Sequence, residues 1–389
     1  MKTVFLKPRF KGLRLHSLYE ELVKHPPDDY SIIVSKNYQK SPYTKVTSKH
    51  HNYLYKQLIY NFGSLPYIIS QLRESSIPYE NYDLIFASQH VLNSKKPWLT
   101  DLEFSNALTG YCNLTLCKNV ISKKLNSKSC KAILPWSKWA ENTLLKALDC
   151  KNFENKINVV RYTVSPKTKP RSIKKDEKIR ILFMGSNNPA NIHSFEFKGL
   201  YETIDAFIEL QRKYDNLELV VRSIVPSDIK KKVKKFSNIK IIEESLSERD
   251  LEKLYQSSDI FPHSGFEVMN LSVLEAMSYG IPVIATSLYN TPEAIQHMKN
   301  GILIELPNPR LFYTKHDTPN DFSKSFLNHM RALRPYMREK LVKYMALIIG
   351  DSALRHKIGR EAELTIREGE FSLKKRNSLL KTIFDEATQ

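Results

Sequence analysis

The stretch Tyr255–Gly301 reads YQSSDIFPHSGFEVMNLSVLEAMSYGIPVIATSLYNTPEAIQHMKNG. Within it, the apolar residues of Asp259–Phe261 predict the end of a buried strand, and Pro262–Met269 predicts a loop at the carboxyl end of that strand. Asn270 is a good N-cap for a following helix, which would end at Gly280 in the usual glycine position. Open α/β sheets bind ligands at such strand ends, so this stretch predicts an α/β fold with its binding site in this loop.

Two glutamates stand at this predicted sheet edge. Glu267 lies in the loop, and Glu275 lies about one turn inside the helix. The backbone at Met269, Asn270 and Leu271 would present the unpaired N–H groups of a helix N-terminus, which suit a diphosphate. The Glu275 carboxylate could accept both hydroxyls of a ribose. The alternative is that Glu275 is a solvated helical residue and Glu267 a surface charge.

The order of residues around these two acids supports the functional interpretation. With Pro262, Ala276 and Gly280 in place, the stretch resembles the donor-binding signature of retaining nucleotide-sugar glycosyltransferases of the GT-B fold, glycosyltransferase family 4. The resemblance implies two Rossmann-like, doubly wound parallel-sheet domains that face each other across a cleft. It also implies that Glu267 lies against the donor sugar, where its charge would stabilise positive charge developing at the anomeric carbon.

A second element of the resemblance lies at the start of the second half of the chain. ILFMG is a strand that ends in Gly185, and Lys198 precedes a glycine that opens a helix. In the family, a lysine and a basic partner clamp the leaving diphosphate. Here Ser186 and Asn187 stand where an arginine is usual. Phosphate neutralisation is therefore expected from Lys198, the helix N-terminus and Arg222.

The resemblance also implies a histidine or an acid at the end of a central strand of the first domain. His90 closes the run YDLIFASQH, and Asp101 and Glu103 lie in KPWLTDLE. We name His90 and Asp101 as the catalytic candidates and favour Asp101 over Glu103. The alternative for Asp101 is that it caps the following helix.

Strand-like runs alternate with helical patterns on both sides of a polar, Pro- and Lys-rich segment, which predicts two domains joined by a linker. The predicted units are an N-terminal acceptor-binding domain (1–165), a linker (166–178), a C-terminal donor-binding domain (179–370) and a final helix (371–389), which the resemblance places back on the first domain. We expect Ile157–Tyr162 to be the last strand of the first domain. Pro307–Pro335 is long, polar and basic for a connection, so we expect it to be either an insertion or partly mobile.

The chain has 389 residues and a formal net charge of +19. This excess favours an acidic partner, such as a phosphorylated donor, an anionic membrane or nucleic acid, unless it reflects only a Lys-rich proteome. The sequence contains no apolar run long enough for a signal peptide or a membrane span, so we expect a cytoplasmic protein with, at most, peripheral membrane contact. The basic, aromatic region Phe10–Phe62 is the candidate for that contact.

The leading function is therefore a retaining hexosyltransferase that uses a nucleotide-diphosphate sugar and a glycan, glycolipid or lipid-linked acceptor. We expect UDP rather than GDP as the nucleotide, only because UDP-sugars are the more frequent donors in the resembled family. No metal or other cofactor is expected, since H-x-x-x-H and strand-end D-x-D patterns are absent. The alternatives are another GT-B catalyst such as an epimerase or phosphorylase, a degenerate GT-B protein, and a basic nucleic-acid-binding protein. The lysine run Ile229–Phe236 reads better as a solvated helix face, so no nucleic-acid partner is expected.

Overall fold

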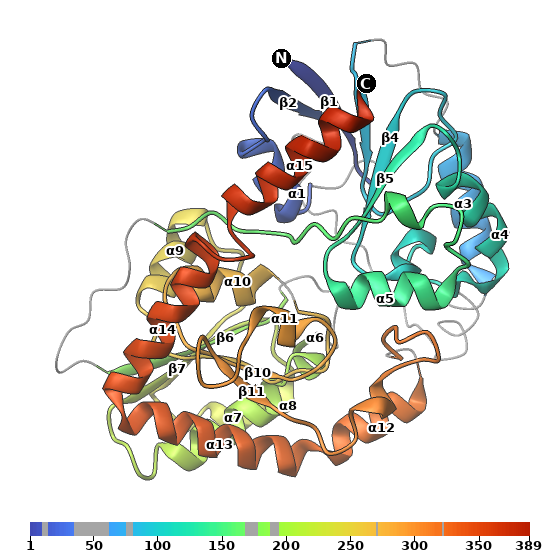
Figure 1. Ribbon diagram of the computed structural model, residues 1–389. Helices are drawn as coiled ribbons and strands as arrows, with labels where there is room; N and C mark the ends of the chain where they lie inside the picture. The colour runs from blue at the N-terminus through green and yellow to red at the C-terminus, as the bar shows by residue number, and fades with distance from the viewer. Residues whose placement is uncertain are drawn as a thin grey trace.

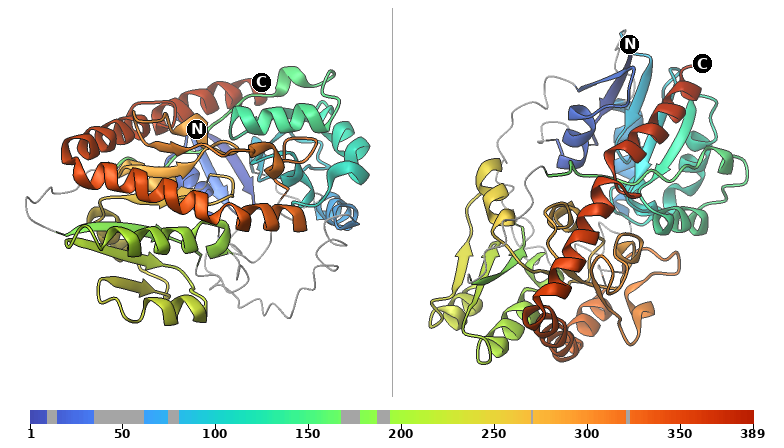
Figure 2. Two further views of the ribbon diagram at one scale, coloured as in Figure 1. Left: turned by 90° about the horizontal axis from the view of Figure 1, so that it is seen from below. Right: turned by 60° about the vertical axis from the view of Figure 1, so that its left-hand side comes forward.

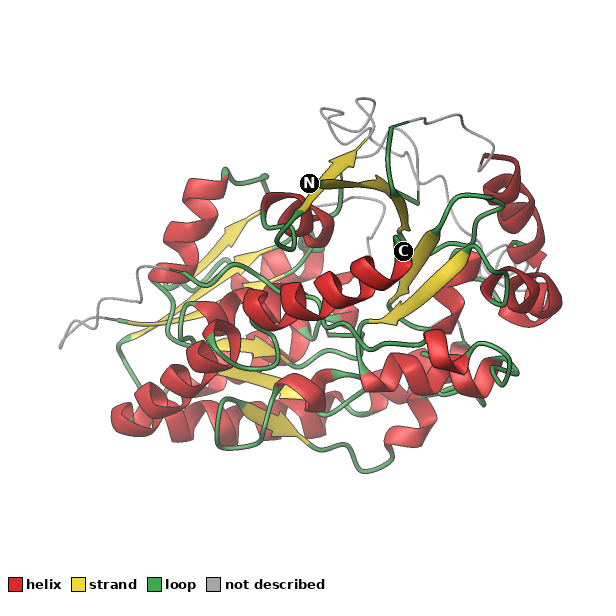
Figure 3. Ribbon diagram, turned by 45° about the horizontal axis from the view of Figure 1, so that its top comes forward, coloured by secondary structure: helices red, strands yellow, loops and turns green. Residues whose placement is uncertain are grey.

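The structure is a computed structural model that describes residues 1–9, 15–34, 62–74, 81–167, 178–186, 194–269, 271–320 and 323–389. Figure 1 shows two α/β domains, one with strands β1–β5 and one with β6–β11. Helices lie on both faces of the sheets (Figure 3). Most of the expected linker and most of the basic region Phe10–Phe62 lie outside the described residues.

The first domain is built on a parallel sheet with strand order β2-β1-β3-β4-β5. Strands β3 and β4 are buried at every residue, as expected for a parallel sheet covered on both faces. The strands are β1 (Lys2–Lys7), β2 (Tyr30–Val34), β3 (Leu84–Ala87), β4 (Trp98–Leu102) and β5 (Cys130–Pro135). The helices are α1 (Ser17–Lys24), α3 (Ser64–Glu74), α4 (Lys118–Leu125) and α5 (Lys138–Ala147), with 3-10 turns η2 (Ser105–Thr109), η3 (Leu114–Cys117) and η4 (Glu154–Lys156).

The second domain contains two three-stranded parallel sheets that meet edge to edge. Their orders are β11-β10-β9 and β6-β7-β8. A parallel bridge joins Ile181 to Ile260, and the Leu182 N–H donates to the Ile260 carbonyl at 2.9 Å. The combined order is therefore β11-β10-β9-β6-β7-β8. The strands are β6 (Ile179–Met184), β7 (Leu217–Arg222), β8 (Ile239–Ile242), β9 (Phe261–His263), β10 (Val283–Thr286) and β11 (Ile302–Ile304).

In the longer helices of the second half, the apolar residues recur at helical spacing, and they form a buried stripe along one side of each helix. Among the helices of the described ranges, none is both long and apolar enough to cross a membrane. They are α6 (Ser194–Phe197), α7 (Leu200–Leu210), α8 (Ser227–Val233), α9 (Glu248–Gln256), α10 (Leu271–Ser278), α11 (Thr291–Ala294), η6 (Pro309–Phe312), α12 (Lys324–Ala332), α13 (Arg334–Gly350), α14 (Ser352–Arg367) and α15 (Leu373–Ala387).

The expectation of a strand at Ile157–Tyr162 was wrong. Only Ile157 makes a parallel bridge, to Ile133, and residues 158–162 are not part of a strand, although the N–H groups of Asn158 and Val160 still donate to carbonyls of β5 at 2.9 Å. The β-branched residues here favour extended backbone, which sequence alone does not distinguish from a strand. The end of the segment instead contacts the second domain, where the Tyr162 hydroxyl donates to the Met269 carbonyl at 2.6 Å.

The chain crosses between the domains a second time at the end of α14. Helix α15 then lies across the first domain, as both views of Figure 2 show. Phe384 packs edge-on against Tyr30, with ring centroids 5.1 Å apart, and against Phe86 at 6.5 Å. Arg161 of the first crossing contacts the second crossing, 3.7 Å from the Glu370 carboxylate.

The carboxyl-terminal edges of the two sheets face each other. Glu293, in the helix after β10, accepts hydrogen bonds from the Lys138 and Trp139 N–H groups at 2.9 and 2.7 Å. Those two groups form the N-terminus of α5, the helix that follows β5. The Tyr162–Met269 bond joins the same two edges. The residues that follow the strands of both domains are thus brought toward one interface.

Candidate functional site

Two glycines allow the loop after β9 to touch the turn between α6 and α7. Gly199 has a left-handed backbone (φ 82°) that L side chains rarely adopt. A Cβ on Gly265 would lie 2.1 Å from the Phe197 carbonyl oxygen, so only glycine fits there. The Phe266 N–H donates to that carbonyl at 2.7 Å. This contact fixes Lys198 beside the loop that contains the first predicted glutamate.

Lys198 and Glu267 form an ion pair at this edge, with Nζ 2.6 Å from Oε1. Their side chains are 13% and 25% exposed. A pair of this exposure stabilises the fold by only about 1 kcal/mol. The lysine can therefore exchange Glu267 for a phosphate at little cost. The structure thus brings together two of the residues that the sequence selected.

His263, the last residue of β9, was not selected from the sequence. It is buried, and its Nε2 lies 3.7 Å from Glu267 Oε1, too far for a hydrogen bond. Burial lowers the pKa of His263 to about 4, so the ring is neutral at neutral pH. The sequence signal that could have identified His263 is its position at the carboxyl end of a strand, directly before the loop that contains Glu267.

The turn that carries Lys198 is anchored by a buried carboxylate. Glu196 of α6 accepts from Arg331 Nε at 2.7 Å and from Arg334 Nη2 at 2.6 Å. Two arginines from α12 and α13 thus hold one buried acid. Buried acids of this kind are stable only when paired, so the pairing fixes α6 and the turn after it.

Glu275 lies inside α10, as predicted. The Tyr255 hydroxyl donates to its Oε2 at 2.8 Å, and burial raises the pKa of Glu275. In the described part of the chain, no side chain or backbone group donates to Oε1. The helix ends at Gly280, whose φ of 67° is the left-handed cap that the sequence predicted. One carboxylate oxygen is therefore held in place while the other is available to a ligand.

The start of α10 differs from the expectation at Met269. The Met269 N–H already donates to Asn290 Oδ1 at 3.0 Å, so it offers no free donor. Asn290, directly before α11, thereby fixes the end of the loop. Leu271 begins the helix. Asn270, the predicted N-cap, lies outside the described residues.

Gly185 and Arg222 meet at the adjacent strand ends. A Cβ on Gly185 would lie 2.1 Å from Ser223 Oγ, so glycine is required there. The Arg222 guanidinium reaches toward the Gly185 carbonyl oxygen, with Nη1 3.5 Å away. Both residues therefore lie at the same sheet edge as the Lys198–Glu267 pair. Asn187 lies outside the described residues.

The first-domain candidates are more deeply buried. His90 is 0% exposed, its Nδ1 donates to the Ser88 carbonyl at 2.9 Å, and burial lowers its pKa to about 3. Asp101 is 3% exposed and accepts from the Tyr19 hydroxyl at 2.9 Å and Trp136 Nε1 at 2.8 Å. Burial raises the pKa of Asp101 to about 7, despite these donors.

Glu103 occupies a different place, directly after the carboxyl end of β4. It is half-buried and accepts from the Tyr111 hydroxyl at 2.6 Å. The Arg9 guanidinium lies over the Tyr111 ring, 4.4 Å from its centroid. Arg9 was not selected from the sequence. Among the residues that the structure describes, no cluster of three or more His, Cys, Asp or Glu side chains is suited to a metal ion.

Comparisons with known proteins concern the fold and the family. Residues 178–317 match the family model described as Glycosyl transferases group 1. The fold is similar to that of Anabaena HepE in complex with UDP-glucose, with a TM-score of 0.59, 14% identity and 99% of each chain covered.

Two further structures cover nearly the whole chain. WaaG, a glycosyltransferase involved in lipopolysaccharide biosynthesis, has a TM-score of 0.57 and 14% identity over 97% of this chain and 99% of its own. A glycosyltransferase from Rickettsia africae has a TM-score of 0.54 and 16% identity over 100% of this chain and 98% of its own. No curated protein sequence matched. The fold is GT-B, with two Rossmann-like domains.

Proposed function

We propose that the chain is a retaining, metal-independent hexosyltransferase of family 4 that uses a nucleotide-diphosphate sugar. One observation carries the proposal: the contact at Gly199 and Gly265 holds a lysine against Glu267 at the sheet edge where α10 presents Glu275. A lysine, a helix N-terminus and a carboxylate suited to a ribose are the groups that a nucleotide-diphosphate sugar requires.

In the proposed reaction, Lys198 leaves Glu267 and binds the diphosphate together with Arg222 and the α10 N-terminus. Glu275 Oε1 accepts from a ribose hydroxyl, while Tyr255 holds its other oxygen. The acceptor hydroxyl attacks the face from which the diphosphate departs, and a phosphate oxygen takes its proton. Glu267, released from the lysine, stabilises positive charge at the anomeric carbon.

On the acceptor side, the geometry moves our preference from Asp101 to Glu103. Asp101 is enclosed by the Tyr19 hydroxyl and the Trp136 indole, whereas Glu103 follows the strand end at the interface. We propose that Glu103 orients the acceptor. Asp101 and His90 would then position the strand ends around it.

UDP remains our first proposal for the nucleotide, which the UDP-glucose complex of HepE supports. A glycan or glycolipid acceptor is supported by the role of WaaG in lipopolysaccharide biosynthesis. Contact with an anionic membrane is a proposal from charge alone. Equal sedimentation with neutral and anionic vesicles would remove it.

The test is a thermal-shift and donor-hydrolysis panel with UDP-, GDP- and ADP-sugars on the native chain, Glu275→Ala and Glu267→Ala. We expect one nucleotide class to stabilise the native chain, and Glu275→Ala to weaken its affinity by about 30-fold or more. Glu267→Ala should keep binding and lose hydrolysis. The matched control is Glu305→Ala, an exposed glutamate, which should behave as the native chain.

Two results would contradict the proposal. If no nucleotide sugar stabilises the chain, the site is degenerate. If the anomeric configuration of a transferred sugar, read by NMR, is inverted relative to the donor, the retaining mechanism is wrong.

A further inference from the structure

The predicted insertion after Pro307 reaches the first domain and encloses a cavity with it. The loop between η6 and α12 lies against α5, where Trp139 Nε1 donates to the Asp317 carbonyl at 3.1 Å. His316 Nδ1 lies 2.9 Å from the Lys146 carbonyl. The cavity between this loop, η2, η3 and the start of α4 has a volume of about 210 Å³. The donor site described above contributes no residue to it.

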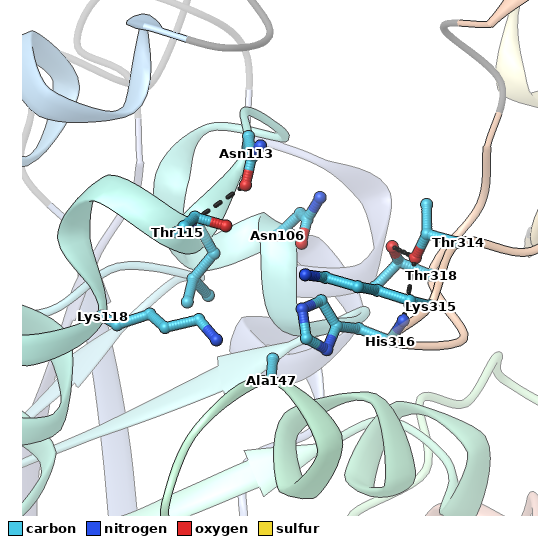
Figure 4. A pocket seen from close by; sticks show the side chains of 10 residues that line it. Asn106, Asn113, Thr115, Lys118, Ala147, Thr314, Lys315, His316 and Thr318 are labelled. Atoms are coloured by element: carbon cyan, nitrogen blue, oxygen red, sulfur yellow. Dashed lines mark hydrogen bonds between the residues drawn. The ribbon is translucent and has the colours of Figure 1, made fainter.

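Several polar side chains line this cavity, beside the apolar Leu114 and Ala147, and none of its lining residues is an acid. Asn106, Asn113 and Thr115 contribute amide and hydroxyl groups from the first domain. Figure 4 shows Lys118 extending from one side, and Lys315 and His316 from the other, toward the same space. The nearest acid of the insertion, Asp317, is already paired with Lys146 and Arg310. Within the described ranges, neither Lys118 nor Lys315 has a carboxylate partner.

His316 completes the arrangement. A carbonyl oxygen can only accept, so the ring must carry its proton on Nδ1, toward Lys146. Nε2 is then an unprotonated acceptor, and it is buried without a hydrogen-bond partner. Burial and the positive charge of Lys118 lower the pKa of His316, and Lys315 adds to this while Asp317 opposes it. The cavity therefore has two unpaired ammonium groups and one ring nitrogen that could gain a proton.

We propose that this interdomain cavity binds an oxyanion, a sulfate- or phosphate-type group that is either free or attached to a sugar. Lys118 and Lys315 supply charge from the two domains, and Asn106, Asn113 and Thr115 supply further polar contacts. Binding is coupled to protonation of His316 at Nε2, because only the protonated nitrogen can donate to the anion. If the proposed function is correct, a sugar-borne anion would belong to the acceptor, since most of the cavity is formed by the first domain.

The first experiment is calorimetric titration with sulfate at constant ionic strength. It uses Lys198→Ala as the background, so that the proposed donor phosphate site cannot contribute. We expect sulfate to bind this background, and Lys118→Gln with Lys315→Gln to weaken the affinity at least about tenfold. Both lysines are at least partly exposed, so folding should be unaffected. The control is Lys123→Gln, on the exposed face of the same helix α4, which should leave the affinity unchanged.

The second arm tests the coupled proton. Sulfate stays doubly charged between about pH 8 and pH 6, and its affinity should rise at least about threefold as the pH falls over this range. His316→Gln should remove that rise. Inorganic sulfate and glucose 6-phosphate are then compared: tighter binding of the sugar phosphate assigns the site to a sugar-borne anion, and tighter binding of sulfate assigns it to a free one.

The proposal is overturned if the double lysine variant binds sulfate as well as its background does, which would indicate an adventitious ion only. It is also overturned if Lys198→Ala alone abolishes binding, because the sulfate would then belong to the donor edge. Neither outcome depends on transferase activity. Failure of this inference is thus separable from failure of the proposed function.

Discussion

The two facing sheet edges contain similar residue types but hold them differently. At the edge of the second sheet, Lys198 and Glu267 pair while 13% and 25% exposed, and Glu275 has one oxygen available to a ligand. At the edge of the first sheet, His90 and Asp101 are almost completely buried among their own hydrogen-bond partners. The comparison teaches that charged residues at strand ends have different uses. Those that can exchange partners are suited to ligands, and those that are enclosed are suited to holding the fold.

The largest expected effect is that of removing Lys198 from its ion pair with Glu267. Lys198→Ala should lower sugar transfer by about a thousandfold, because a donor to the leaving phosphate is lost. The melting temperature should change little, since the pair is partly exposed. Transfer rates and thermal unfolding measured on the same preparations check this. If the variant loses much stability but transfers sugar at the native rate, Lys198 has a structural role, like the buried residues at the edge of the first sheet.

The second prediction concerns Asp101. Its folded pKa of about 7 lies above the unfolded value, so the stability that this group contributes is present at low pH and is lost as pH rises toward 7. The loss is up to about 4 kcal/mol at neutral pH, and Asp101→Asn should remove it from the pH profile of unfolding. Denaturant unfolding at a series of pH values measures this.

Glu103→Gln is the matched variant for Asp101→Asn. We expect it to lower transfer and to leave the pH profile of unfolding unchanged. If Asp101→Asn abolishes transfer while Glu103→Gln does not, the acceptor-side residue is the one that the sequence favoured.

The third prediction concerns the glycine contact that assembles the second edge. Gly265→Ala should reduce stability by about 3 kcal/mol, because its Cβ would overlap the Phe197 carbonyl oxygen. Transfer should fall with it, since Lys198 would move from Glu267. The control is Gly350→Ala, at the end of α13, where the nearest atom to a Cβ is the Tyr214 hydroxyl at 3.7 Å. Equal stability of the two variants would mean that the loop contact is not needed.

The smallest expected effect concerns the contact between the domains. Glu293→Gln should cost about 1 kcal/mol, because the amide retains one acceptor for the α5 N-terminus but loses its charge. Chemical denaturation measures the change. A loss of several kcal/mol would show that the interface, rather than each domain core, limits stability.

Sequence reasoning located the second edge well because its residues lie in one short segment. The strand, the loop, the helix and its end at Gly280 are all local features, and the structure contains each of them. The strand bounds were wrong by two residues, because Pro262 and His263, which were predicted to begin the loop, belong to β9. The contact through Gly265 could not be predicted, since it depends on how closely two segments far apart in sequence approach each other. The bond from the Met269 N–H to Asn290 also joins residues 21 positions apart, which the local pattern does not predict.

The first edge was harder to predict because burial decides what its acids do. Asp101 and Glu103 are only two residues apart, so the sequence pattern cannot tell that one ends inside β4 and the other follows it. Only the enclosing groups Tyr19 and Trp136, which are distant in sequence, distinguish the two. The error at Ile157–Tyr162 has a similar origin: only its first residues pair with β5, and its end instead contacts Met269 of the second domain.

The two crossings of the chain make association of the domains intramolecular. Since the halves cannot diffuse apart, the effective concentration of one at the other is high, and contacts too weak to join separate proteins suffice to close the cleft. The contact of Glu293 with α5 is of this weak, polar kind. Added salt should therefore favour the open arrangement without separating the halves, and small-angle scattering would detect this as an increase in radius of gyration. If opening limits product release, turnover would rise with ionic strength while affinity for the donor fell.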